Sequence, residues 1–246
     1  MKLHRWQILL GLALLIASVM LYFLHYVVFH DAHHIYIYLL GDLAFMPIEV
    51  LLVTMIVHEV LRQREKKSRL EKLNMVIGAF FSEVGTNLLV LFSDFDPNLN
   101  AIKNDLLVSN DWTANDFDRI AKKLRGYEYE IEIDKVDLEH LRKLMAEKKD
   151  FLVRLLENPN LLEHESFTDL LWGVFHLAEE LTARKKVKDL PKNDLEHIKI
   201  DVRRVYVQLV NQWLDYMKHL KKNYPYLFSL AMRTNPFDET AAAEVK

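Results

Sequence analysis

Two carboxylates lie inside the second long apolar stretch of the chain. Asp42 and Glu49 are the only charged residues between Ile35 and Val57, and they are seven residues apart. In an α-helix this spacing places both side chains on one face, within about 20° of each other. A charged side chain at the centre of a bilayer costs on the order of 2.5–3.5 kcal/mol. The pair therefore predicts a helix face that meets protein or water instead of lipid.

Three hypotheses fit this face, which also carries Tyr38. In the first, Glu49, Asp42 and Tyr38 line a cation pathway at the axis of a homo-oligomer, as acidic rings do in cation channels. In the second, the acids are protonated or paired with His25 and Tyr side chains, and they hold helices together. In the third, they respond to pH. Pro47 removes one helical hydrogen bond and leaves the carbonyl of Leu43 without its usual donor, which adds one more oxygen ligand.

The first apolar stretch, Trp6 to Phe29, carries a small and polar face of its own. Gly11, Ser18 and His25 repeat at seven residues. Small residues let two helices approach closely, and polar residues supply hydrogen bonds between them. We therefore predict Gly11, Ser18, His25 and Pro47 as helix-packing positions. Two helices alone cannot shield two carboxylates from lipid, so we expect several copies of the chain to assemble.

Histidines gather between the two apolar stretches. His30, His33 and His34 stand within five residues, together with Asp31. Imidazole and carboxylate groups bind divalent transition metals, and histidine titrates near neutral pH. The cluster is a candidate for a metal site. The alternative is a turn of ordinary polar residues.

Pairs of histidine and acidic residues at helical spacing recur in the rest of the chain. They are Asp137 with His140, His176 with Glu179, Asp194 with His197, His197 with Asp201, and Asp215 with His219. A di-metal helical bundle uses Glu-x-x-His motifs that face inward, whereas Asp stands in the place of Glu here. Glu83 and His176 are the pair that we select for inspection in the structure.

The composition of the chain excludes several classes of function. The chain has no Cys, which excludes disulfides and thiolate chemistry. It also lacks a phosphate-binding loop, a nucleophile elbow and a zinc-protease motif. Lys and Arg number 32 against 35 Asp and Glu, a balance that argues against nucleic acid as a partner. We predict no enzyme and no cofactor.

The two apolar stretches are long enough to be membrane spans. Trp6 to Phe29 contains no Asp, Glu, Lys or Arg. It reaches about 36 Å as a helix, enough to cross a hydrocarbon core of about 30 Å. A signal peptide would have a shorter apolar core that ends in small residues, whereas this stretch continues to Phe29. We therefore predict spans at about 6–29 and 35–57.

Basic residues flank the outer ends of this pair of spans. Lys2 and Arg5 precede it, and the segment that follows it contains Arg62, Arg64, Lys66 and Lys67. The turn between the spans has no Lys or Arg. The positive-inside rule then places both termini in the cytoplasm of a multi-pass protein in a prokaryotic-type inner (cell) membrane. The basic segment after the second span is also a candidate for binding lipid head groups.

The remaining residues predict a helical bundle, so the expected fold is all-α. The expected domains are a transmembrane hairpin over 1–61, a cytoplasmic helical domain over 62–240 and a disordered tail over 241–246. Expected helices, from their apolar period and their caps, are 70–92, 113–124, 137–157, 166–184, 193–223 and 225–235. Residues 126–134 read as a linker or a short extended piece.

The leading functional hypothesis is a homo-oligomeric cation channel in the lipid bilayer, with the chain itself as its partner and inorganic cations as the conducted species. The alternative is a membrane-anchored scaffold or sensor whose helical bundle binds a protein.

Overall fold

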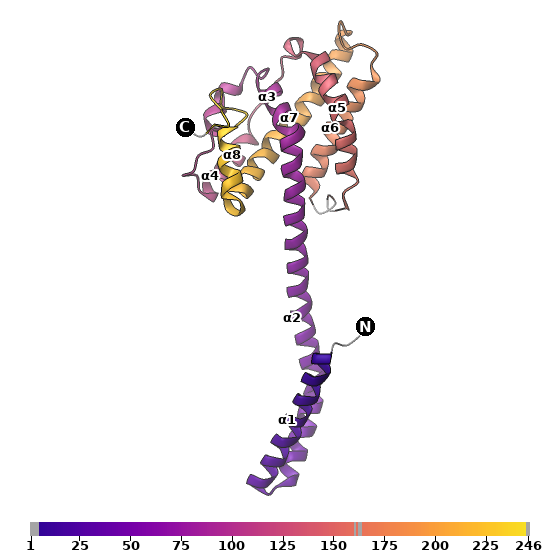
Figure 1. Ribbon diagram of the computed structural model, residues 1–246, viewed down its shortest axis with the longest axis vertical. Coiled ribbons are helices and arrows are strands. Elements are labelled where there is room, and N and C mark those ends of the chain that lie inside the picture. Colours follow the sequence, from indigo (N-terminus) through magenta and orange to yellow (C-terminus); the bar gives the residue numbers. More distant parts are fainter. Residues whose placement is uncertain (1–4, 160, 162–163, 245–246) are drawn as a thin grey trace. The chain divides into compact units, whose positions relative to one another are not determined.

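The computed structural model describes residues 5–159, 161 and 164–244 (Figure 1). Every regular element among these residues is a helix, which confirms the all-α fold. The chain divides into two compact units, Met1–Glu65 and Lys66–Lys246. We call the second unit the helical domain, and each unit is described by itself.

The first unit is a pair of helices joined by two residues. Helix α1 spans Arg5–Phe29, and α2 begins at Ala32 and continues to Phe80. His30 has a left-handed backbone (φ 52°) and donates its backbone N–H to the carbonyl of Tyr26 (2.8 Å), which ends α1. The carboxylate of Asp31 accepts the backbone N–H of His34 (3.1 Å) and so caps α2. The turn is therefore shorter than the polar stretch His30–His34 suggests.

Apolar side chains of this unit face outward. No residue of α1 is buried, and the buried residues of α2 begin only at Leu73. Both helices are long and apolar enough to cross a membrane. Pro47 lies within α2, which continues on both sides of it.

The helical domain is built around α7 (Lys192–Asn223). Helix α7 packs on α3 (Thr86–Ser93), α4 (Ala114–Leu124), α6 (Glu165–Ala183) and α8 (Pro225–Arg233), and α5 (Leu138–Leu156) packs on α6 (Figure 1). The shorter elements are a π-helical turn, η1 (Phe81–Gly85), and the 3₁₀ turns η2 (Leu99–Ala101), η3 (Lys103–Leu106) and η4 (Ile133–Lys135). Apolar side chains from all of the α-helices of this domain form one core.

A wide turn separates α2 from α3 where the sequence predicts one regular helix. Residues Phe81–Gly85 form a π-helix, so the uninterrupted helix expected over 70–92 is wrong at this point. Gly85 shows the reason. A Cβ atom at this position would lie 2.7 Å from Phe81 Cδ1 and 2.8 Å from Phe80 Cε1, so two aromatic rings fill the space beside the backbone.

Local cap chemistry sets most helix starts where the sequence places them. Thr113 and Asp116 form a reciprocal capping box at α4, with the backbone N–H of Thr113 donating to the Asp116 carboxylate at 2.8 Å. At α6 the predicted N-cap residue is wrong. His164 Nδ1 accepts the backbone N–H of Phe167 (3.3 Å), whereas the predicted cap, Ser166, accepts a hydrogen bond from Gln212 Nε2 (2.8 Å).

The segment 126–134 is part of the core, so its reading as a linker is wrong. Tyr129, Ile131 and Ile133 are buried, and the backbone N–H of Glu132 donates to the carbonyl of Phe95 at 2.9 Å. Alternate residues therefore face inward, as in an extended piece. The expected disordered tail, 241–246, lies outside the described residues at 245–246, and residues 241–244 follow the domain as coil and bends.

Candidate functional site

The acidic face of α2 consists of Tyr38, Asp42 and Glu49, and all three side chains are exposed. Within the described part of the chain, neither carboxylate has a hydrogen bond or an ion pair. Their neighbours on this face are apolar and exposed as well: Phe45, Met46 and Val53. Two unpartnered carboxylates therefore stand in a surface that is otherwise made of hydrocarbon.

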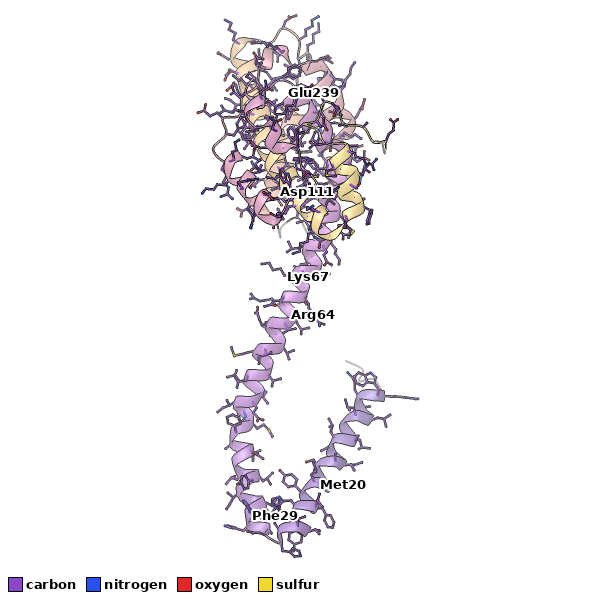
Figure 2. All side chains as sticks on the ribbon, turned by 90° about the vertical axis from the view of Figure 1, so that its left-hand side faces the viewer. Met20, Phe29, Arg64, Lys67, Asp111 and Glu239 are labelled. Carbon is purple, nitrogen blue, oxygen red and sulfur yellow. The ribbon has the colours of Figure 1, made fainter. Side chains whose placement is uncertain are left out.

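The first helix does not cover this face. Figure 2 shows that the two helices meet at the turn, beside Phe29, and diverge from it. A Cβ atom added at Gly11 or at Gly41 would meet nothing within 4 Å, and Ser18 is exposed. The small residues predicted for helix packing thus make no close contact within one chain, and their surface is open to a second copy.

His25 is the predicted packing residue that does contact the other helix. Its ring centroid lies 5.9 Å from that of His34, and the His34 ring lies 4.7 Å from Tyr38. His25 Nε2 is buried and has no hydrogen-bond partner. Tyr38 therefore belongs to an aromatic group next to the turn as well as to the acidic face.

The outer histidines do not form a compact set of ligands. Among the described residues, the structure does not bring His30, His33 and His34 together as a group of three metal-ligating atoms. The helix of α2 already includes His33 and His34, whereas His30 occupies the left-handed position at the end of α1.

The basic segment after the second apolar stretch is exposed on α2. Arg64, Lys66 and Lys67 project from the helix, as the labelled side chains in Figure 2 show for Arg64 and Lys67. Arg62 donates from Nε to the carboxylate of Glu59 at 3.0 Å. This hydrogen bond lowers the pKa of Glu59 and raises that of Arg62, so both groups stay charged and their opposite charges offset each other. The free positive charge of the segment thus resides mainly in the other residues.

The histidine and acid pairs of the helical domain separate into structural pairs and one cluster. Asp137 caps α5 by accepting two backbone N–H groups, and Asp194 binds Arg184 at 2.6 and 3.0 Å. In the pair selected for inspection, Glu83 accepts a hydrogen bond from Lys148 Nζ at 2.8 Å and not from His176.

His176 instead lies beside His197 and Asp201. Asp201 is 2% exposed and therefore lies within the core of the helical domain. The sequence contains one part of this cluster, the four-residue spacing of His197 and Asp201. It contains no signal for the contact with His176, because that contact depends on how α6 packs on α7.

Comparison with known proteins gives two family models and one curated relative. Residues 2–61 match the model described as "MJ1433, N-terminal helical domain", and residues 69–233 match "Uncharacterized protein MJ1433, C-terminal helical domain". The chain is similar to "Uncharacterized protein MJ1433" of Methanocaldococcus jannaschii, with 47% identity over 234 residues that cover 95% of this chain and 94% of the relative. No solved structure matches.

Proposed function

The chain belongs to the MJ1433 family, which joins an N-terminal to a C-terminal helical domain, and we propose that it acts as a homo-oligomeric integral membrane protein whose second spans surround a cation pathway. One observation carries this proposal. Asp42 and Glu49 have no partner within the described chain, although they lie on an exposed helix face that is otherwise apolar.

The bilayer accounts for the exposed surface of the first unit. Helix α1 has 25 residues and therefore reaches about 37 Å, more than the hydrocarbon core of a bilayer. Water-soluble monomers rarely expose an apolar patch larger than a few hundred Å². In this proposal the basic segment, with Arg64, Lys66 and Lys67, lies at the cytoplasmic head groups and the turn at His30 lies outside.

Self-association accounts for the acidic face. Lipid contact for two carboxylates would cost on the order of 2.5–3.5 kcal/mol each, and α1 does not shield them. Neighbouring copies provide the missing cover, and the open surfaces at Gly11 and Gly41 allow their helices to approach closely. Repetition of Asp42 and Glu49 around an axis produces two acidic rings.

Such rings attract cations and repel anions. Carboxylates and the carbonyl of Leu43, which Pro47 leaves without a donor, are hard oxygen ligands that replace water around an ion. The proposed pathway therefore passes cations in preference to anions, with Glu49 near the middle of the span.

Reconstitution tests this function. The wild-type chain in a planar bilayer under a salt gradient should give currents whose reversal potential indicates cation selectivity. Glu49→Gln and Asp42→Asn each remove one negative charge per copy, and thus the charge of one ring, and should move the reversal potential toward zero. Leu51→Gln is the matched control, because it adds the same amide on the opposite side of the helix. The proposal fails if the wild type gives no current, or if both charge variants keep the wild-type selectivity.

A membrane-anchored sensor or scaffold is the second candidate, and the continuity of α2 favours it. This helix runs without a break from Ala32 to Phe80, and its last turns place Leu73, Ile77 and Phe80 in the core of the helical domain. In this second candidate, α2 is the element that would pass a signal from the span to the domain. Specific capture of one protein by the full chain, lost when the exposed surface of the helical domain is changed, together with an absence of currents, would support this function.

A further inference from the structure

Two helices of the domain each present a pair of metal-ligating residues to the other. Helix α6 carries His176 and Glu180, and α7 carries His197 and Asp201. Each pair has a spacing of four residues, so its two side chains lie on one helix face. Helices α6 and α7 pack directly on one another (Figure 1). The packing therefore brings two imidazoles and two carboxylates into one place.

Asp201 is the centre of this group. Its side chain is 3% exposed, and Arg204 binds one of its oxygens, Oδ1, at 3.1 Å. The other oxygen, Oδ2, is buried and has no hydrogen-bond partner. An ionised oxygen that is withdrawn from water without a donor is strongly disfavoured. Oδ2 thus requires a cation or a donor from the direction in which it points.

Both imidazoles lie in that direction. His176 Nε2 and His197 Nε2 are each 3.5 Å from Asp201 Oδ2, and the three atoms all lie within 4.8 Å of one another. These distances are too long for good N–H···O hydrogen bonds, which have their mode near about 2.9–3.0 Å. Direct hydrogen bonds from the histidines therefore do not satisfy Oδ2.

The distances do suit a shared ion. Ligand atoms at about 2.0–2.1 Å from a tetrahedral Zn²⁺ lie about 3.3–3.4 Å from each other. The distances from Asp201 Oδ2 to the two imidazole nitrogens are already close to that length. The distance between the two imidazole nitrogens has to shorten by no more than about 1.5 Å to reach it. His176 and His197 are half-exposed, so their rings can rotate and an ion can reach them from solvent.

The surroundings supply negative charge and hold the ligands in place. Glu180 Oε2 lies 3.6 Å from His197 Nε2 and accepts a hydrogen bond from Arg184 at 2.7 Å. Arg204 orients the carboxylate of Asp201 through its other oxygen, the kind of outer contact that supports metal ligands in proteins.

We propose that His176, His197 and Asp201 bind one divalent transition-metal ion of the Zn²⁺ class and thereby fasten α6 to α7. Two imidazoles and one carboxylate favour ions of this class over Mg²⁺ or Ca²⁺, which prefer oxygen ligands alone. The remaining coordination positions face solvent and take water. This site is independent of the proposed membrane pathway, because it lies wholly within the helical domain.

Metal titration of the full chain tests the proposal. The protein is purified in detergent with a tag that contains no histidine, stripped with a chelator, and titrated with ZnCl₂ by calorimetry at near-neutral pH. We expect one saturable ion per chain. His176→Gln and His197→Gln should each weaken binding by at least about 10- to 100-fold, the loss that changes to supporting residues alone produce. Unchanged affinity in these variants, or no saturable binding by the wild type, would overturn the proposal.

Two controls separate this site from other causes. His140→Gln removes an exposed histidine of α5 and should leave the affinity unchanged. A variant in which His30, His33 and His34 are all replaced by Gln should also keep one bound ion, which excludes the outer turn as its location. Because His176 and His197 are half-exposed, their variants should fold.

Thermal melts check that expectation and provide a second readout. Zn²⁺ should raise the Tm of the wild type and of His140→Gln, but not that of His197→Gln. Equal stabilisation of all three proteins by Zn²⁺ would contradict the proposed ligands.

Discussion

At the scale of single residues, the carboxylates of this chain differ in the partners that their surroundings provide. Buried Asp96 accepts the Tyr127 hydroxyl at 2.7 Å and the backbone N–H of Asn98 at 2.9 Å. Asp194 binds the guanidinium of Arg184 through both oxygens. Asp42, Glu49 and the Oδ2 atom of Asp201 receive no hydrogen bond from the described chain, although the first two lie among apolar side chains and the third is buried.

These three carboxylates carry both functional proposals. The first proposal covers Asp42 and Glu49 with neighbouring copies and cations, and the second places a metal ion between Asp201 and two imidazoles. Both proposals follow from the free energy of removing a charged oxygen from water. Helical spacing along the sequence was enough to place Asp42 and Glu49 on one face. It was not enough to find the cluster around Asp201, because His176 joins it through the packing of two helices.

His219 provides a pH-dependence prediction at the same scale. Its Nε2 atom is buried without a partner, and burial lowers the pKa of the imidazole, an effect that Glu71 opposes and Lys222 reinforces. The folded state therefore binds this proton less readily than the unfolded state does. The stability that neutral His219 provides is present above the unfolded pKa of about 6.5 and is lost as the pH falls through the lower folded pKa.

Unfolding by urea at a series of pH values between neutral and mildly acidic measures this effect. His219→Gln should show a smaller loss of stability on acidification than the wild type, whereas His140→Gln, on an exposed site, should follow the wild type. Identical pH profiles for the wild type and His219→Gln would show that burial of this imidazole does not disfavour its protonation.

At the scale of elements, the sequence predicts those helix starts that depend on contacts between residues close together in the chain. The starts of α4 and α5 follow from Thr113 and Asp137, whose side chains bind backbone N–H groups within three residues. The π-turn at Phe81–Gly85 has no such local signal, because it depends on how two phenylalanine rings pack around Gly85. The α6 cap fails for a related reason, since Ser166 is engaged by Gln212 from α7.

Gly85→Ala tests the packing of this turn. The added methyl group would lie under 3 Å from the rings of both Phe80 and Phe81, so both buried rings or the backbone beside them have to move. We expect a loss of stability of about 1–3 kcal/mol, as for other overpacked cores. Gly126→Ala is the matched control, because its nearest neighbour would be the Lys123 carbonyl at 3.7 Å. Urea denaturation of both variants gives the comparison, and equal stability would mean that the rings at Gly85 adjust freely.

At the scale of the whole molecule, the distribution of apolar residues predicts most of the organisation. Contiguous apolar stretches predict two long helices, and periodic ones predict a helical domain with α7 as its longest core element. Residues 126–134 show the limit of this reading. Their acidic positions suggest a linker, but the alternate residues Tyr129, Ile131 and Ile133 fill the core. Only the tertiary structure shows that these three side chains have a core to pack into.

The absence of Cys makes the acidic face accessible to a direct test. Val53 lies on that face, within about 20° of Asp42 around the helix axis. Leu51 lies on the opposite side of the helix, less than one turn from Val53 along the axis. A cysteine at either position is then a unique reporter. A thiol reacts as its thiolate, which forms in water but not in hydrocarbon.

The decisive measurement is the rate at which a charged, water-soluble thiol reagent labels Val53→Cys and Leu51→Cys in intact membranes. If the second spans surround a water-filled cation pathway, Val53→Cys reacts many times faster than Leu51→Cys. Equal rates at the two positions, or no reaction at Val53→Cys, would contradict the proposed pathway.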